Sequence, residues 1–137
     1  MNIDSIKNGI VIDHITAGKG MEIYQLLGLG NLSCMVALIN NAVSEKMGRK
    51  DIIKIDEIIE LDTDVLGYVD PNVTVSIISN GKTVEKKKMS LPLELEDVLR
   101  CRNPRCICST EQELPNIFKL VDPAKREYRC IYCESKV

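Results

Sequence analysis

The chain has 137 residues, of which 45% are hydrophobic and 28% charged, and its formal net charge is −2. This composition is typical of a globular protein and argues against disorder along the whole chain, while the small negative charge disfavours a strongly basic nucleic-acid-binding protein. No apolar run is long enough to span a bilayer, and the N-terminus lacks the apolar segment of a signal peptide. We therefore expect a cytoplasmic protein that does not enter a membrane.

Strands and helices are expected to alternate in the first two thirds of the chain. In chain order, the patterns predict a strand over 9–15, a helix over 19–28, strands over 33–39 and 49–55, a helix over 62–69, and strands over 73–79 and 83–88. Gly28 and Gly30 mark the end of the first helix, Asp62 is the expected N-cap of the second, and Asn80-Gly81 indicates a type I′ hairpin. The order predicts an α+β fold with a ferredoxin-like antiparallel sheet and helices on one face.

A break in composition near residues 90–93 predicts two domains, 1–92 and 93–137. Five of the six cysteines follow residue 100. A piece of about 45 residues normally needs a metal or disulfides to fold, and cytosolic proteins rarely use disulfides. We therefore expect the second domain to be a small all-β zinc-binding domain.

The cysteine spacing predicts the metal site. Cys101 and Cys106 form a pair with four residues between them, and after 23 further residues Cys130 and Cys133 form a C-x2-C pair. Four thiolates in two pairs suit tetrahedral Zn²⁺, and a site with no open position is structural. A rubredoxin-like iron and a redox pair are the alternatives. We interpret Cys108 as a packed thiol beside this site.

Basic side chains are concentrated on two predicted strands. Strand alternation puts Lys50, Ile52 and Lys54 on one face and Asp51 on the other, and a second basic run covers 86–88. If the two strands are neighbours, the ammonium groups converge on one patch suited to a polyphosphate. The alternative is a solvated strand face and an edge strand that lysines protect from aggregation.

Asp13 and His14 end the first predicted strand. They are candidates for reading a ribose or base edge, for catalysis, or for capping the next helix. The sequence carries no Walker motif, no G-x-G-x-x-G motif and no local nucleophile signature. A free-standing enzyme is therefore disfavoured. We also expect Cys34, inside an apolar predicted strand, to be buried as a small hydrophobic residue.

Several motifs together carry a family resemblance over nearly the whole chain. They are the segment 6–15 (IKNGIVIDHI), the segment 47–55 (MGRKDIIKI), Ser90-Leu91-Pro92, and the four-cysteine spacing that ends in 130–134 (CIYCE). In this order they resemble the regulatory chain of aspartate carbamoyltransferase. The resemblance implies a non-catalytic chain with an N-terminal ferredoxin-like nucleotide-binding domain and a C-terminal zinc domain that docks on the catalytic chain. It also implies three regulatory-chain homodimers joining two catalytic trimers, activation by ATP, and inhibition by CTP, often together with UTP.

The resemblance implies a role for each residue of the nucleotide site. Asp13 and His14 would lie at the ribose or base, Lys50 and Lys54 near the sugar and phosphates, and Lys86 at the triphosphate. The base would contact Val11, Ile52 and Ile78 and the N-terminal backbone of Ile3, Asp4, Ser5 and Ile6. The family's zinc ligands fall on Cys101, Cys106, Cys130 and Cys133, in agreement with the spacing.

The sequence departs from the family pattern near the base and sugar. Ser76 stands where the pattern has Asn, and Gly81 where it has Tyr, so the base preference is open. Lys87 and Lys88 add positive charge, and the segment between Ile39 and Met47 also differs. A zinc-ribbon nucleic-acid module is the rival class, but residues 93–137 carry equal numbers of basic and acidic side chains and few aromatics. We expect no nucleic-acid partner.

Overall fold

The structure is a computed structural model that describes residues 6–111 and 113–136. The chain forms two compact units, Met1–Ser90 and Leu91–Val137, each built on its own sheet. Among the described residues, no helix is both long and apolar enough to cross a bilayer.

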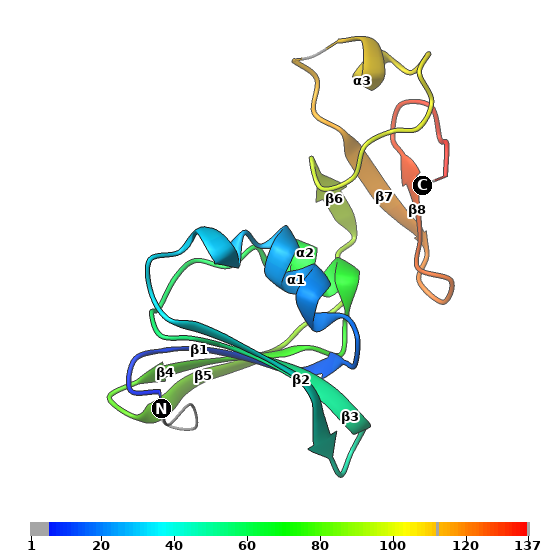
Figure 1. Cartoon of the computed structure of the whole chain (residues 1–137). Helices are drawn as coiled ribbons and strands as arrows, with labels where there is room; N and C mark the ends of the chain where they lie inside the picture. Colours follow the sequence, from blue (N-terminus) through cyan, green and yellow to red (C-terminus); the bar gives the residue numbers. More distant parts are fainter. Residues whose placement is uncertain (1–5, 112, 137) are drawn as a thin grey trace. The chain divides into compact units, whose positions relative to one another are not determined.

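The N-terminal unit is a five-stranded antiparallel sheet with two short helices. Its elements are β1 (Gly9–Thr16), α1 (Gly20–Leu26), β2 (Val36–Ser44), β3 (Gly48–Ile55), α2 (Thr63–Val69), β4 (Thr74–Ser79) and β5 (Lys82–Lys88), with a 3-10 turn over Leu29–Asn31. The strand order is β2-β3-β1-β4-β5, and every pairing is antiparallel. Both helices lie over the same face of the sheet (Figure 1). The predicted ferredoxin-like α+β fold is confirmed.

The core of this unit lies between the sheet and the helices. Ile10 and Ile12 of β1 pair with Ile55 and Ile53 of β3, and all four side chains are at most 1% exposed. Leu66 of α2 is also fully buried. Burial of one such side chain stabilises the fold by about 1.5–3 kcal/mol. Because side chains alternate along a strand, the residues between these isoleucines lie on the opposite face, which α1 and α2 do not cover.

Two predicted local signals place the ends of elements as expected. The Asp62 carboxylate accepts hydrogen bonds from the backbone N–H groups of Asp64 and Val65, at 3.1 and 3.2 Å, and so caps α2. Gly28 follows the C-cap of α1 in the left-handed conformation, with φ of 65°. Helix α1 is shorter than predicted, since it begins at Gly20 and ends at Leu26.

The β4–β5 hairpin also holds the start of β1. Asn80 and Gly81 have φ of 53° and 77°, so the predicted type I′ turn is confirmed. The Gly81 N–H donates to the Lys7 carbonyl oxygen at 2.9 Å, and the Asn80 N–H donates to Asn8 Oδ1 at 3.2 Å. The segment before β1 is therefore fastened to the turn.

The prediction for the second strand was wrong in position and burial. Strand β2 begins at Val36 rather than at residue 33 and continues to Ser44. Among the described residues its single strand neighbour is β3, so Val36, Leu38 and Ile39 are half-buried rather than buried, and Val43 is 78% exposed. Cys34 precedes the strand and is also half-buried, which corrects its assignment to the core. An unbroken apolar run is typical of a central strand, and this led to the error.

The C-terminal unit is a small three-stranded sheet with one helical turn. Its elements are β6 (Glu94–Glu96), α3 (Ile107–Thr110), β7 (Ile117–Asp122) and β8 (Glu127–Cys130), in the strand order β6-β7-β8. Leu95, Phe118 and Tyr128 form its apolar core and are at most 2% exposed. The Tyr128 hydroxyl donates to the Pro92 carbonyl oxygen at 2.7 Å. The expected small β domain is confirmed, with α3 as a turn that the sequence did not predict.

Candidate functional site

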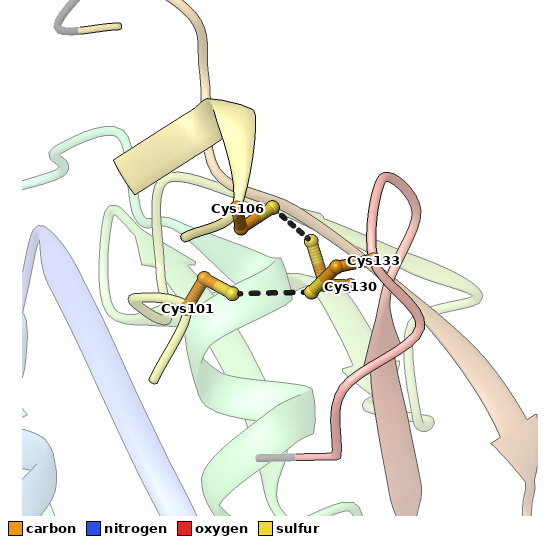
Figure 2. Close-up of side chains that lie close together, drawn as sticks. All are labelled: Cys101, Cys106, Cys130 and Cys133. Carbon is orange, nitrogen blue, oxygen red and sulfur yellow. Dashed lines mark hydrogen bonds between the residues drawn. The ribbon is translucent and has the colours of Figure 1, made fainter. Parts of the chain in front are cut away.

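Four cysteine sulfurs meet at one end of the C-terminal sheet. Cys106 is the N-cap of α3, Cys130 ends β8, and Cys101 and Cys133 lie in the adjoining loops. Figure 2 shows the four side chains pointing toward one another, and all four Sγ atoms lie within 4.8 Å of each other. The Sγ–Sγ distances are 3.6 Å between Cys101 and Cys133 and 3.7 Å between Cys106 and Cys130. Four sulfurs at about 2.3 Å from a tetrahedral Zn²⁺ would be about 3.8 Å apart, so the spacing suits that ion.

Backbone turns hold both cysteine loops closed. In the wider first loop, Asn103 Oδ1 accepts from the Arg105 N–H at 3.0 Å, and the Asn103 carbonyl accepts from the Cys106 N–H at 3.1 Å. In the second loop, the Cys130 N–H donates to the Ser135 carbonyl oxygen at 3.0 Å. The four-residue insert between Cys101 and Cys106 therefore forms a turn, as its sequence indicates.

The thiols of this cluster have unequal acidities. Burial raises the pKa of the Cys101 thiol to about 11. Hydrogen bonds from the side chain and backbone of Ser135 lower the pKa of Cys133 to about 6, against the effect of burial. A divalent cation at their centre supplies the charge that four thiolates need.

Arg129 lies next to Cys130 and forms an ion pair and a hydrogen bond beside the second cysteine loop. Its Nε lies 3.2 Å from Glu127 Oε2, and its Nη1 donates to the Glu134 carbonyl oxygen at 2.9 Å. Desolvation opposes ionisation of Glu127, but Arg129 and then Lys136 outweigh it and hold its pKa below the ordinary value. Arg129 thus ties β8 to the second cysteine loop.

Cys108 lies closer to the cluster than a packed thiol would require. It is 5% exposed, and its Sγ is 3.3 Å from Cys106 Sγ and 3.9 Å from Cys130 Sγ. The sequence did not indicate this contact, because the two cysteines of a zinc-binding pair typically have two to four residues between them and Ile107 alone separates Cys106 from Cys108. Cys106 is the extended N-cap of the one-turn helix α3, which begins at Ile107, and Cys108 lies inside that turn.

The open face of the N-terminal sheet carries the residues expected to bind a nucleotide. Lys54 of β3 pairs with Val11 of β1, Val11 pairs with Ser76 of β4, and Ser76 pairs with Lys86 of β5. Directly paired residues share a face, so these four side chains form one row across the sheet. The same face carries the other members of the predicted set on these strands, Asp13, Lys50, Ile52 and Ile78.

Strand alternation in β3 is as predicted, but its lysines do not neighbour those of β5. Asp51, Ile53 and Ile55 are buried, and Lys50 and Lys54 lie on the open face. Two strands, β1 and β4, stand between β3 and β5. Neighbouring strands are about 4.8 Å apart, so the Lys54 and Lys86 backbones are separated by roughly 14 Å. The basic groups therefore flank a strip of sheet instead of forming one adjacent patch.

A bulge in β1 places Asp13 and His14 at the rim of this face. The register shifts between Ile12 and Ile15, and His14 has a φ of 60°. Asp13 Oδ1 lies 2.9 Å from Lys50 Nζ and accepts from the His14 N–H at 2.6 Å, while His14 Nδ1 lies 3.2 Å from Thr74 Oγ1. Burial opposes ionisation of Asp13, but these hydrogen bonds and the nearby positive charge lower its pKa. Neither residue caps α1, so the capping alternative was wrong.

The carboxylate at the start of α1 belongs to Asp51 instead. Asp51 is fully buried and accepts from the backbone N–H groups of Gly18, Gly20 and Asn41 at 3.0, 2.9 and 3.0 Å. A Cβ atom on Gly20 would lie 2.8 Å from Asp51 Oδ2, so the close approach requires glycine there. The sequence carries one indication of this role, because strand alternation places the acidic Asp51 on the inward face of a largely apolar strand.

Of the predicted N-terminal contacts, Ile6 lies within the described residues and is half-buried. Ile3, Asp4 and Ser5 lie outside the described residues.

Comparisons with known proteins cover the whole chain. A family model described as "Aspartate carbamoyltransferase regulatory chain, allosteric domain" matches residues 1–90, and one described as "Aspartate carbamoyltransferase regulatory chain, metal binding domain" matches residues 93–137. Proteins named aspartate carbamoyltransferase regulatory chain are similar to it. One from Clostridium botulinum is 54% identical over 98% of this chain and 92% of its own length. One from Clostridium acetobutylicum is 52% identical over the same shares, and one from Bifidobacterium longum is 42% identical over 99% and 98%.

Proposed function

Because the chain belongs to the family of aspartate carbamoyltransferase regulatory chains, we propose that it senses nucleotides and controls the catalytic chains of that enzyme. It is the non-catalytic subunit, with an allosteric domain followed by a metal-binding domain. In this proposal ATP, CTP and UTP bind the N-terminal unit, and their effect reaches carbamoyl transfer, a step of pyrimidine biosynthesis. The cytoplasmic location predicted from the sequence stays a prediction.

The C-terminal unit holds one structural Zn²⁺ in this proposal. The ligands are Cys101, Cys106, Cys130 and Cys133, and the observation that carries the assignment is their mutual distance, at most 4.8 Å. Sulfur donors in two closed loops favour zinc over harder cations. The ion supplies a fixed positive centre that holds the two loops together, and the residues of the loops set the outline of the docking surface.

The nucleotide lies across the open face of the N-terminal sheet in this proposal. Lys54 lies near the sugar and phosphates, Lys86 binds the triphosphate, and Asp13, bound to Lys50, faces the sugar. Val11, Ile52 and Ile78 supply an apolar floor for the base. Ser76, in the middle of the row, has a shorter side chain than the Asn of the family pattern and leaves more room beside the base.

Assembly with other chains follows the family in this proposal. The chain forms homodimers, and three such dimers join two catalytic trimers. The outer edge of β2 supports a self-association surface, because β3 is its single strand neighbour among the described residues, Val36–Ile39 are half-buried and Val43 is 78% exposed. Each nucleotide shifts the enzyme by binding one quaternary state better, a difference typically of about 1–3 kcal/mol.

The decisive experiment is reconstitution with aspartate carbamoyltransferase catalytic trimers. Carbamoyl transfer is measured with and without the chain while ATP, CTP and UTP are titrated. We expect no activity from the chain alone, complex formation by size-exclusion chromatography, and a nucleotide-dependent change of activity in the complex only. A complex whose activity ignores all three nucleotides would refute the regulatory proposal.

A further inference from the structure

One buried sulfur at the cysteine cluster lies outside the proposed ligand set. Cys108 belongs to α3 and follows the proposed ligand Cys106 by two residues. It is 5% exposed, and its Sγ lies 3.3 Å from Cys106 Sγ and 3.9 Å from Cys130 Sγ. A cysteine that only fills space packs against apolar groups. The Cys108 sulfur instead contacts two sulfurs of the cluster.

The three sulfurs form a triangle of the size that metal ligands form. Its edges are 3.3 Å between Cys106 and Cys108, 3.7 Å between Cys106 and Cys130, and 3.9 Å between Cys108 and Cys130. Thiolates on a common Zn²⁺ are about 3.8 Å apart. The Sγ atoms of Cys106 and Cys108 therefore lie at similar distances from Cys130 Sγ, 3.7 and 3.9 Å. The Cys108 sulfur lies 3.3 Å from the position that the Cys106 sulfur occupies.

We propose that Cys108 is a reserve ligand of the metal centre and replaces Cys106 when Cys106 does not bind. The proposal rests on the metal site of the proposed function. In the exchange, the bond from Cys106 sulfur to the ion breaks and a bond from Cys108 sulfur forms. The Cys108 thiol proton passes to the Cys106 thiolate across the 3.3 Å contact. The number of thiolates on the ion, and hence the charge of the site, stays the same.

The test uses the full chain with Zn²⁺ or Co²⁺ as the probe. Metal content is measured by mass spectrometry, and the sulfur-to-cobalt charge-transfer absorption reports how many thiolates bind Co²⁺. The variants are Cys106→Ser, Cys108→Ser and the double variant Cys106→Ser/Cys108→Ser. Cys133→Ser is the matched control, because it removes a ligand that lies beside Cys101 rather than in the triangle.

The reserve ligand predicts a specific pattern. Cys106→Ser retains one metal per chain with a four-thiolate cobalt spectrum, whereas the double variant and Cys133→Ser show three thiolates or lose the metal. Cys108→Ser alone keeps the wild-type spectrum. The proposal is overturned if Cys106→Ser shows three thiolates, binds no metal or fails to fold, since each outcome means that Cys108 did not take over. Loss of metal from Cys108→Ser also overturns it, because Cys108 would then be an obligatory ligand.

Failure of the underlying metal site gives a different result. If the wild-type chain itself binds neither Zn²⁺ nor Co²⁺, the proposed zinc site is wrong and the reserve ligand is wrong with it. If the wild-type chain binds the ion and Cys106→Ser behaves like Cys133→Ser, the zinc site stands and Cys108 is not its reserve ligand.

Discussion

Asp51 joins three backbone segments through one buried carboxylate. Its oxygens accept from the N–H groups of Gly18, Gly20 and Asn41. We expect Asp51→Ala to lower the free energy of unfolding of the N-terminal unit by about 3 kcal/mol, because buried donors left without a partner cost about 1–3 kcal/mol each. Urea denaturation followed by circular dichroism measures the change.

The matched variant for Asp51 is Asp62→Ala. Asp62 also binds backbone N–H groups, but two of them at the more exposed start of α2, so the expected loss is about 1 kcal/mol. If the Asp51→Ala variant is at least as stable as the Asp62→Ala variant, Asp51 does not stabilise the unit by joining three backbone segments.

The lysines of the open sheet face give a second prediction for single residues. We expect Lys54→Ala and Lys86→Ala each to weaken CTP and ATP binding by about tenfold or more, since a hydrogen bond to a charged group contributes about 1.5–3 kcal/mol. Isothermal titration calorimetry measures both affinities on the full chain.

Lys87→Ala is the control for the loss of charge. Lys87 pairs with the inward-facing Val75, so it lies on the other face of β5 from Lys86. We expect its removal to leave both affinities within about twofold, apart from weak long-range electrostatics. Equal effects of Lys86→Ala and Lys87→Ala would show that net charge, and not the row, governs binding.

Single residues divide clearly into those that sequence predicts and those that it does not. The Asp62 cap and the inward and outward positions of β3 follow from local rules, since a cap acts within three residues and a strand alternates. Asp51 and Cys108 each have a partner in another element of the fold: Asn41 of β2 for Asp51, and Cys130 of β8 for Cys108. Such contacts leave no pattern within one element.

At the scale of elements, the β4–β5 turn combines two positive-φ residues with a connection to the N-terminal segment. We expect Gly81→Ala to destabilise the N-terminal unit by about 1–2 kcal/mol, because a side chain is disfavoured at its φ of 77°. The midpoint of thermal unfolding measures the effect. Asn80→Gly relieves the neighbouring position, with φ of 53°, and should leave the midpoint unchanged or raise it. Equal losses in the two variants would contradict an origin in backbone strain.

Elements with a strong local signal were found, and those that depend on their neighbours were misplaced. The Asn-Gly hairpin and the β-α-β-β-α-β order are visible because turn residues and periodicity are local. The first and last residues of β2 depend on where its pairing with β3 begins and ends. The apolar run in its sequence does not indicate those positions. The turn α3 is four residues long and follows a cysteine loop, so it has no helical period to detect.

At the scale of the molecule, the two units have separate cores and separate sheets. We therefore expect Cys130→Ser/Cys133→Ser, which removes the second cysteine loop as a ligand pair, to abolish zinc binding and assembly with catalytic trimers. Nucleotide affinity should stay within about twofold of wild type, because the core around Ile10 and Ile53 does not involve the metal. Zinc content is measured by metal analysis, assembly by size-exclusion chromatography with catalytic trimers, and nucleotide affinity by calorimetry.

Cys34→Ser is the control for that experiment, because it removes a half-buried thiol of the N-terminal unit. It should retain zinc, assembly and nucleotide binding. If the Cys130→Ser/Cys133→Ser variant still assembles with catalytic trimers, the docking surface does not depend on the metal.

The row from Lys54 to Lys86 touches four strands in succession, and the last of them, β5, is exposed along its whole length. A ligand that contacts every strand of the row links β5 to the rest of the sheet, because β5 cannot separate from β4 without breaking its contacts with the ligand. Bound nucleotide should therefore slow hydrogen exchange most at the amides of β4 and β5, and little in β2, which lies beyond the row. Nucleotide binding on the open face would then stabilise the edge strand β5 against separation from the sheet.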